Sequence, residues 1–356
     1  MKIALLGTGF GQVHAAVYAQ RAEVDEVIVY GRTPQKLAKI SDQFGFATTT
    51  DLRTAITDEG VDLVDICLPT RLHADVAIQA MQAGRDVLIE LPLADTLDNA
   101  HRVIATQHDT GRRAFVDMFS RFGPANRHLR AAVAEHRYGP LRTLEIENRT
   151  ALLWPGYDLT LATLALDMMH ADFDLVTGLL GRPDTVHLAG VDGLDGRGSA
   201  AAVVLDYPDA FARLSGSALM PQPYGMRGGW RATFTDGLLE YAMSAGFAGQ
   251  GPATLTEQTS AGERPLELTA ANPYEAMIDH VLTCLTVQAD NLIEPASALP
   301  ALELTLQVHQ RLNQSAPGGT CRWANNRENH RGPNHLTKPT GVRGGRRRPP
   351  GQGAMR

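Results

Sequence analysis

The sequence predicts two folded domains, a doubly wound α/β domain over residues 1–122 and an α+β domain over residues 123–314. In the first part, short apolar runs alternate with helix-compatible segments, which is typical of a parallel sheet covered on both faces. After about residue 123, neighbouring strand-like segments with turn residues between them favour an open, mostly antiparallel sheet with helices. A chain of 356 residues is long enough for two such cores.

The expected elements follow from these patterns. The first domain is expected to hold five strands, at residues 2–6, 26–30, 61–68, 86–90 and 114–118. The second is expected to combine helices at 125–135, 161–180, 274–288 and 296–312 with strands at 141–150, 184–191, 200–207, 212–218, 230–235 and 237–241. Ligands of a parallel sheet lie beyond the carboxyl ends of its strands, so we expect the site there.

A glycine-rich turn follows the first strand and opens a helix. Its residues are Gly7, Thr8, Gly9, Phe10 and Gly11. Such a turn allows a pyrophosphate to approach the backbone and the helix N-terminus, and it predicts a Rossmann-type dinucleotide site. The third glycine of G-x-G-x-x-G would fall at Gln12, and a purely structural glycine turn is the alternative.

The end of the second strand indicates which dinucleotide is bound. An acidic residue there would accept hydrogen bonds from the ribose of NAD, but this chain has Gly31. Arg32, Thr33 and Lys36 supply positive charge and a hydroxyl instead, which favours the 2′-phosphate of NADP(H). The alternative is a solvated turn before a basic helix start.

Composition and charge exclude several classes of protein. Residues 1–314 carry a net charge of −14, which argues against a nucleic-acid partner, whereas residues 315–356 carry +8. We expect this Gly- and Pro-rich basic tail to be disordered and dispensable, with an arm for a nucleic acid or an acidic partner as the alternative. No apolar run reaches membrane-spanning length, the chain starts with a strand rather than a signal peptide, and the three cysteines lack metal-ligand spacing. We therefore expect a cytoplasmic protein without a metal site.

Three segments together resemble the Gfo/Idh/MocA oxidoreductase family over about residues 1–313. They are GTGFGQVH at 7–14, the block at 67–94 and Asn-Pro-Tyr-Glu at 272–275. The resemblance implies a nicotinamide-binding Rossmann domain, an open-sheet domain, dimers or tetramers, and hydride transfer at a sugar or cyclitol carbon. It also implies that five residues border the cofactor, with the last near the nicotinamide: Leu68, Pro69, Thr70, His73 and Glu90.

The chain departs from the family at the proton-transfer residues. Family members usually have Glu-Lys-Pro where this chain has Glu90-Leu91-Pro92, and leucine cannot transfer a proton. Leu91 instead indicates an apolar floor beside the nicotinamide, which suits a hydrophobic substrate. The loss of the lysine favours an imine, enone or unusual ketone of a specialised metabolite, because these groups accept hydride with less help from an acid.

The family also carries an aspartate and, four residues later, a histidine on a helix facing the nicotinamide. Here Asp167 is followed at that spacing by Ala171, with His170 one position earlier. Positions i and i+3 share a helix face, so Asp167 and His170 are catalytic candidates. The shift turns the side chain by about 100°, and a core-edge histidine and a carboxylate in a first helical turn are the alternatives.

Aromatic residues before this helix complete the candidates. Tyr157 is a candidate proton donor, Trp154 a candidate stacking group for substrate, and Arg121 a candidate lining residue. The sequence thus predicts an NADPH-dependent oxidoreductase of small molecules, assembled as a homodimer or homotetramer through its second sheet. A redox-silent lyase, cyclase or isomerase that retains the dinucleotide is the main alternative, and a non-catalytic sensor is a third.

Overall fold

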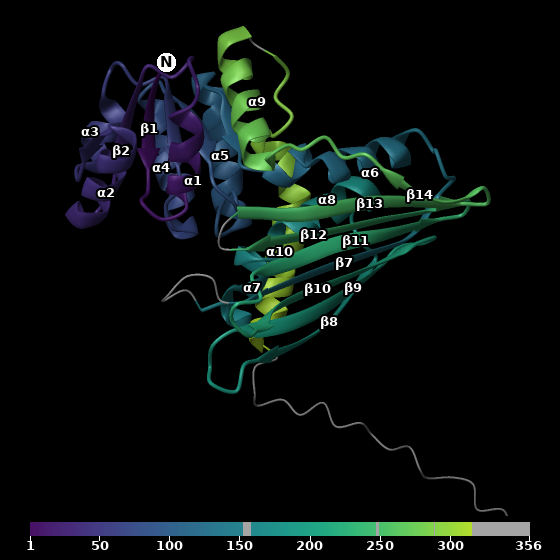
Figure 1. Cartoon of the computed structure of the whole chain (residues 1–356). Helices are drawn as coiled ribbons and strands as arrows, with labels where there is room; N and C mark the ends of the chain where they lie inside the picture. Colours follow the sequence, from purple (N-terminus) through teal and green to yellow (C-terminus); the bar gives the residue numbers. More distant parts are fainter. Residues whose placement is uncertain (152–157, 247–248, 288, 315–356) are drawn as a thin grey trace, which may run out of the picture. The chain divides into compact units, whose positions relative to one another are not determined.

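The computed structural model describes residues 1–151, 158–246, 249–287 and 289–314 (Figure 1). Its first sheet is wholly parallel and has the order β3-β2-β1-β4-β5-β6. The strands are β1 (Lys2–Leu6), β2 (Glu26–Tyr30), β3 (Ala47–Thr49), β4 (Leu63–Ile66), β5 (Asp86–Ile89) and β6 (Ala114–Val116). Five are the expected strands, and the sequence analysis missed β3, a short and mostly exposed edge strand. The order reverses at β1, which places a ligand crevice beyond its carboxyl end.

Five helices connect these strands. They are α1 (Gly11–Tyr18), α2 (Pro34–Phe44), α3 (Leu52–Thr57), α4 (His73–Gln82) and α5 (Leu97–Thr110). Local signals set their ends: the Asp51 side chain accepts the first free N–H groups of α3, and the left-handed Gly45 and Gly111 follow α2 and α5. Strands and helices therefore alternate as the sequence predicts for a Rossmann domain.

The second sheet has eight strands in the order β14-β13-β12-β11-β7-β10-β9-β8. They are β7 (Leu141–Ala151), β8 (Thr185–Asp192), β9 (Ser199–Asp206), β10 (Phe211–Met220), β11 (Met226–Phe234), β12 (Leu238–Gly246), β13 (Gly249–Thr259) and β14 (Gly262–Leu266). All neighbouring pairs are antiparallel except β7 and β10, as a mostly antiparallel open sheet requires. The sequence analysis missed β13 and β14, whose polar residues lack the strong apolar alternation of the inner strands.

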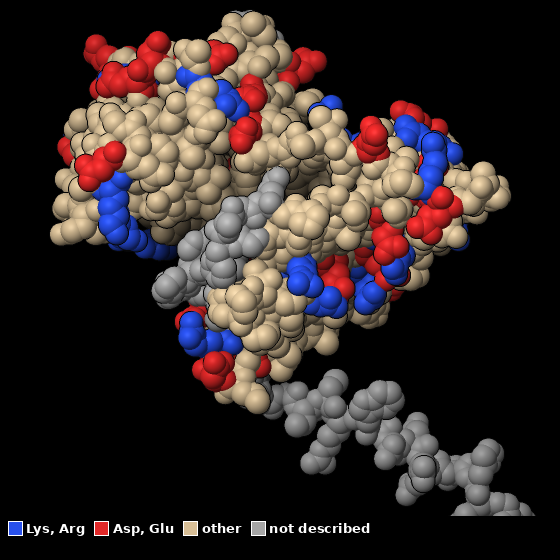
Figure 2. Space-filling view, in the orientation of Figure 1, with Lys and Arg blue, Asp and Glu red and all other residues tan. Residues whose placement is uncertain are grey.

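Helices cover one face of this sheet (Figure 1). They are α6 (Pro124–Ala134), α7 (Leu161–Asp167), α8 (His170–Leu180) and part of α10 (Pro295–Gln314); α9 (Pro273–Val287) lies against the first domain. The other face carries cross-strand ion pairs such as Arg213 with Glu145 and Arg231 with Glu240, and Figure 2 shows charges of both signs over these strands. No helix in the described part of the chain is long and apolar enough to cross a membrane.

The buried apolar side chains form two clusters, one around each sheet. Helix α10 joins them, because Ala298 and Leu302 pack in the first cluster and Val308 and Leu312 pack in the second. The core of the first domain therefore includes residues from the end of the chain, and a boundary at residue 122 stays a prediction. The predicted disordered tail, residues 315–356, lies outside the described residues.

Candidate dinucleotide and active site

The glycine turn has the shape that a bound pyrophosphate requires. Gly7 has φ +129°, and a β-carbon there would overlap the carbonyl oxygen of Cys67. Gly9 is exposed, and a β-carbon there would meet nothing within 4 Å, so the backbone is open on that side. Helix α1 then starts at Gly11 without a side-chain cap, and the N–H groups of Gln12 and Val13 donate to the Gly9 and Phe10 carbonyl oxygens at 3.2 and 2.8 Å.

Gly11 takes the place of the missing third glycine. A β-carbon at Gly11 would lie 3.4 Å from the Cys67 Cβ and 3.4 Å from Leu5 Cδ1, so the absence of a side chain lets α1 approach the sheet closely. Close helix–strand packing is the role of the third glycine in a dinucleotide motif. The irregular spacing at Gln12 therefore does not disrupt the fold of the loop.

The end of β2 has no room for an acidic side chain. A β-carbon at Gly31 would lie 2.5 Å from Thr8 Cγ2 and 3.0 Å from Leu37 Cδ2. Arg32, Thr33 and Lys36 follow at the surface, where α2 begins at Pro34. Among the described residues neither Arg32 nor Lys36 has an ion-pair partner, so both charges are available to a phosphate.

The residues that were predicted to border the cofactor after β4 and β5 include accessible and buried ones. Pro69 is exposed, and Leu68, Thr70 and Leu91 are partly exposed. His73 is fully buried, with Nδ1 2.9 Å from the Pro92 carbonyl oxygen and Nε2 2.6 Å from that of Leu68. His73 therefore holds the turns after β4 and β5 together, rather than reaching out to the cofactor.

A buried ionic cluster lies beneath the glycine loop, and the sequence analysis missed all of it except Glu90. His14 of α1 is fully buried, with Nδ1 2.8 Å from Asp65 Oδ2 and Nε2 3.0 Å from Asp117 Oδ2. A Glu90 carboxylate oxygen lies 3.7 Å from the same Nε2, and Tyr18 donates a 2.7 Å hydrogen bond to Asp65. We name these five residues the His14 cluster.

The cluster sets the charge state of its members. Burial by itself lowers the pKa of His14, but the facing groups, Asp65 first among them, raise it well above its ordinary value, so the ring is an imidazolium. Burial and the neighbouring Asp117 raise the pKa of Glu90 well above its ordinary value. Ligand atoms of His14, Cys67 and Glu90 lie within 4.8 Å of one another, but both ring nitrogens already face carboxylates, and we interpret the group as hydrogen-bonded.

Aromatic rings cover this cluster. Phe10 of the glycine loop contacts His14 edge-on, with ring centroids 5.9 Å apart, and packs on Tyr274 at 5.4 Å. Tyr274 in turn stacks on Phe119 at 4.2 Å. Tyr274 belongs to the Asn-Pro-Tyr-Glu segment at the start of α9, so this segment helps to cover the cluster.

The predicted catalytic pair does not share a helix. The expected helix at 161–180 breaks at Met168 and Met169, so that Asp167 is the exposed last residue of α7 and His170 is the buried first residue of α8. His170 Nδ1 lies 2.6 Å from Thr305 Oγ1, and burial lowers the pKa of the ring to about 4. Two interpretations are therefore wrong. Asp167 and His170 are not at positions i and i+3 of one helix, and Asp167 lies in the last turn of α7 rather than in a first helical turn. Met168 follows the end of α7, and Met169 precedes the start of α8.

Arg121 is held in a structural ion pair. It binds Asp174 through Nη2 at 2.7 Å and Nε at 3.0 Å, and it also reaches Ser297 Oγ at 2.8 Å. Arg130 approaches the same carboxylate at 3.3 Å, and the Asp174 side chain is only 3% exposed. The guanidinium is thus occupied in joining α8 to the start of α10, and its place in the substrate cleft stays a prediction.

One carboxyl in the second domain has chemistry that the sequence analysis did not single out. Asp172, in the first turn of α8, accepts hydrogen bonds from Asn148 Nδ2 at 2.8 and 3.0 Å. Burial raises the pKa of Asp172 to about 7 against the opposing effect of Asn148. It directly follows Ala171, the place of the family's histidine. The predicted Trp154 and Tyr157 lie outside the described residues.

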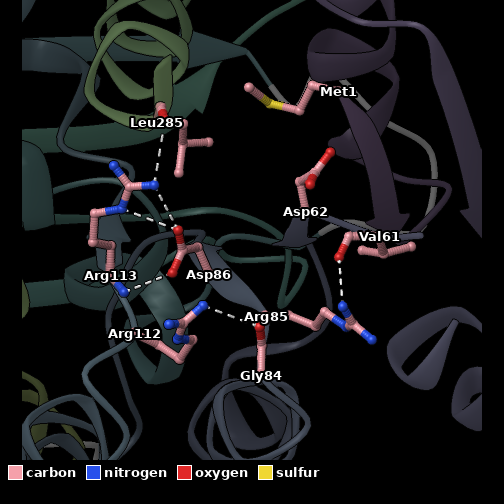
Figure 3. Close-up of a pocket in the computed structure, with 9 residues that line it drawn as sticks. All are labelled: Met1, Val61, Asp62, Gly84, Arg85, Asp86, Arg112, Arg113 and Leu285. Atoms are coloured by element: carbon pink, nitrogen blue, oxygen red, sulfur yellow. Dashed lines mark hydrogen bonds and ion pairs between the residues drawn. The ribbon is translucent and has the colours of Figure 1, made fainter. Parts of the chain in front are cut away.

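The structure also has a pocket that lies away from the dinucleotide site. Figure 3 shows a pocket of about 450 Å³ near Met1, Asp62 and Asp86, at the amino ends of the strands. Its arginines are bound within the chain, since Arg113 pairs with Asp86 at 2.9 Å and Arg85 donates to the Val61 carbonyl at 3.1 Å. The glycine loop lies at the opposite edge of the sheet, so this pocket is separate from the dinucleotide site.

The fold and the glycine loop define a dinucleotide-binding protein of the Rossmann class with a second, open-sheet domain. Residues 1–118 match the Gfo/Idh/MocA family, described as an oxidoreductase family with an NAD-binding Rossmann fold, and this match assigns the Rossmann fold to the N-terminal domain.

The relatives and solved structures agree with this assignment. The chain is 34% identical to the 4-carboxy-2-hydroxymuconate-6-semialdehyde dehydrogenase of a Sphingobium species over 131 residues, 36% of this chain and 42% of the relative. It thus spans less than half the length of that curated relative. Among solved structures, the UDP-N-acetylglucosamine 3-dehydrogenase of Acidithiobacillus ferrooxidans aligns with TM-score 0.72 at 23% identity, covering 87% of this chain and 97% of that one. The biliverdin reductase of Synechocystis, solved with biliverdin and NADP⁺, aligns with TM-score 0.72 at 19% identity, covering 87% and 98%.

Proposed function

We propose that this protein is an NADP(H)-dependent oxidoreductase that reduces an imine, enone or ketone of a specialised metabolite. The observation that carries the proposal is the shape of the dinucleotide site. Gly9 leaves the loop open for a pyrophosphate, Gly31 has no room for a carboxylate, and Arg32 and Lys36 have no ion-pair partner among the described residues. A free arginine suits a 2′-phosphate, which an acidic residue would repel.

Different residues of the chain would bind different parts of the cofactor. The glycine loop and the start of α1 would hold the pyrophosphate, and Arg32, Thr33 and Lys36 would hold the 2′-phosphate. Leu68, Pro69, Thr70 and Glu90 would border the nicotinamide end, which supplies a hydride when the cofactor is bound. Leu91 makes this end more apolar than a lysine would, which supports a hydrophobic substrate.

The substrate side of the site is proposed from fewer residues. Asp172 directly follows Ala171, the position at which the family has its histidine. Its pKa of about 7 suits proton transfer at neutral pH. Trp154 and Tyr157 stay candidates for substrate contact. We also propose a cytoplasmic homodimer or homotetramer formed through the helix-free face of the second sheet, without a nucleic-acid or membrane partner.

The direct test is a screen for NADPH oxidation. Purified protein is mixed with NADPH and a panel of cyclic imines, enones and aromatic ketones, and absorbance of the reduced nicotinamide is followed. We expect turnover with at least one of these classes and none with common sugars. Turnover of sugars or cyclitols alone would contradict the proposed substrate class.

A redox-silent reaction is the second candidate, and one observation favours it. The lysine of the family is replaced by Leu91, and its histidine by Ala171, while the neighbouring His170 is buried against Thr305. A lyase, cyclase or isomerase would form product from substrate with bound NADP(H) but without net consumption of it. Product analysis by mass spectrometry beside the absorbance assay separates the two functions.

A further inference from the structure

Two carboxyl groups in the His14 cluster have oxygens that no donor reaches. Glu90 Oε2 and Asp117 Oδ1 are both buried, and neither has a hydrogen-bond partner in the described part of the chain. The other oxygens are engaged: Asp117 Oδ2 faces His14 at 3.0 Å, and Glu90 Oε1 accepts the Leu91 N–H at 2.9 Å. A buried oxygen without a donor costs about 1–3 kcal/mol, so two of them side by side require an explanation.

A single proton shared between Glu90 and Asp117 would give both unpaired oxygens a hydrogen-bond partner. If the Glu90 carboxyl is protonated, it becomes a donor, and the adjacent Asp117 is the acceptor that also lacks a partner. The surrounding charge agrees, because the His14 imidazolium can neutralise one of Asp65 and Asp117 but not Glu90 as well. Three ionised carboxylates around one buried cation would leave two negative charges without compensation.

One carboxyl side chain of the His14 cluster is partly exposed to solvent. The Glu90 side chain is 16% exposed, whereas those of His14, Asp65 and Asp117 are fully buried. Glu90 is therefore the most exposed carboxyl side chain of the His14 cluster, although its Oε2 is buried. It precedes Leu91, the position where the family has its proton-transferring lysine.

We propose that Glu90 is the proton donor of this protein, holding a proton that it shares with Asp117 and replacing the missing lysine. The inference rests on the proposed reductase function. For each C=X bond reduced, the carbon gains the hydride supplied by NADPH, X gains the proton released by Glu90, and NADP⁺ results. The Glu90 carboxylate, whose side chain is partly exposed, then regains a proton from water. His14, Asp65 and Asp117 are positioning residues.

Other groups also face Glu90 and affect its titration. They are His14 of α1, Cys67, Asp117 and Tyr274 of α9. Of these, His14 carries positive charge and favours ionised Glu90, whereas Asp117 opposes it. The test therefore changes Asp117 as well as Glu90.

The protonation state can be measured without any turnover. The full-length protein is labelled with ¹³C at the glutamate side-chain carboxyl, and each carboxyl resonance is followed by NMR from pH 4 to pH 9. We expect one resonance, absent in Glu90→Gln, to remain in the protonated position at pH 7. Asp117→Asn should shift its titration to lower pH, because the like charge is removed. Glu59→Gln, which removes an exposed glutamate, is the matched control and should leave this resonance unchanged.

A Glu90 resonance that is already ionised at pH 7 in the wild-type protein would overturn the proposal. Turnover provides the second measurement: Glu90→Gln should lower kcat by about 10²–10⁴-fold, the usual share of general acid catalysis, with NADPH affinity within about threefold. Unchanged kcat would also overturn it. A protonated Glu90 in a protein that binds NADPH but never consumes it would support the shared proton and contradict the reductase function, so the two failures are distinguishable.

Discussion

At the scale of single residues, the choice of cofactor depends on one glycine and the basic residues after it. Gly31 excludes any side chain that could bind an adenosine ribose with a carboxylate, because Thr8 and Leu37 fill that space. The adjacent Arg32 is exposed and has no ion-pair partner among the described residues. The proposed selectivity for NADPH would thus come from a steric exclusion together with an available charge.

Replacing Arg32 tests that charge. Arg32→Ala should weaken NADPH binding by about 1–3 kcal/mol, the range for a lost charge-assisted hydrogen bond, and leave NADH binding nearly unchanged. Binding is measured by nicotinamide fluorescence. Lys39→Ala, which removes another exposed charge of α2, serves as the control and should have little effect. An equal loss for both cofactors would show that Arg32 does not contact the 2′-phosphate.

Two glycines of the loop should respond differently to the same substitution. Gly9→Ala meets no atom within 4 Å, so we expect the free energy of unfolding to change by less than about 0.5 kcal/mol while NADPH affinity falls. Gly7→Ala forces a positive φ and a clash with Cys67, and should destabilise the protein by more than about 1 kcal/mol. Urea unfolding and NADPH titration of both variants provide the measurements. Equal destabilisation by the two would contradict an open backbone at Gly9.

At the scale of elements, the break between α7 and α8 decides what His170 does. The residue begins a new helix and packs inside, where its Nε2 has no partner among the described residues. Apolar periodicity continues across Met168 and Met169, so the sequence alone predicts one helix from 161 to 180. A helix break between apolar residues leaves no signal in that pattern.

His170 should make the protein sensitive to acid. Its pKa in the folded protein is about 4, below its ordinary value of 6.5, because burial disfavours the charged ring. The unfolded chain then binds a proton that the folded one does not, and stability is lost as the pH falls from 6.5 towards 4, by up to about 3 kcal/mol. His170→Gln should remove this part of the pH dependence, as measured by urea unfolding of both proteins at pH 7, 5.5 and 4.5. Parallel curves for the two proteins would contradict a neutral buried His170.

At the scale of the whole molecule, the sequence predicts the architecture well and the charged interior poorly. Strands β1, β2, β4, β5 and β6 are apolar runs with turn residues around them, and their pattern is enough to predict a parallel sheet. The clearest missed signal is Asp65, a charged residue inside the apolar run of β4 that is fully buried. Its partner His14 lies 51 residues before it, and Asp117, the other carboxylate that faces His14, lies 52 residues after it, so only the folded chain shows that they belong together.

The parts of the candidate site that depend on nearby residues were predictable from the sequence, and the parts that depend on distant residues were not. The glycine turn and the Gly31–Lys36 segment depend on local backbone geometry, which follows from nearby residues. The partners of Arg121 were not predictable, because Asp174 and Ser297 come from distant helices and such tertiary contacts cannot be inferred from spacing.

The central claim is that the first domain binds NADPH in preference to NADH, and one titration tests it most directly. Full-length protein is titrated with each cofactor, and binding is followed by nicotinamide fluorescence at low and moderate salt. We expect saturable binding of NADPH, at least tenfold tighter than that of NADH, with a preference that decreases as salt screens Arg32 and Lys36. Tighter binding of NADH, or no binding of either cofactor, would contradict the account.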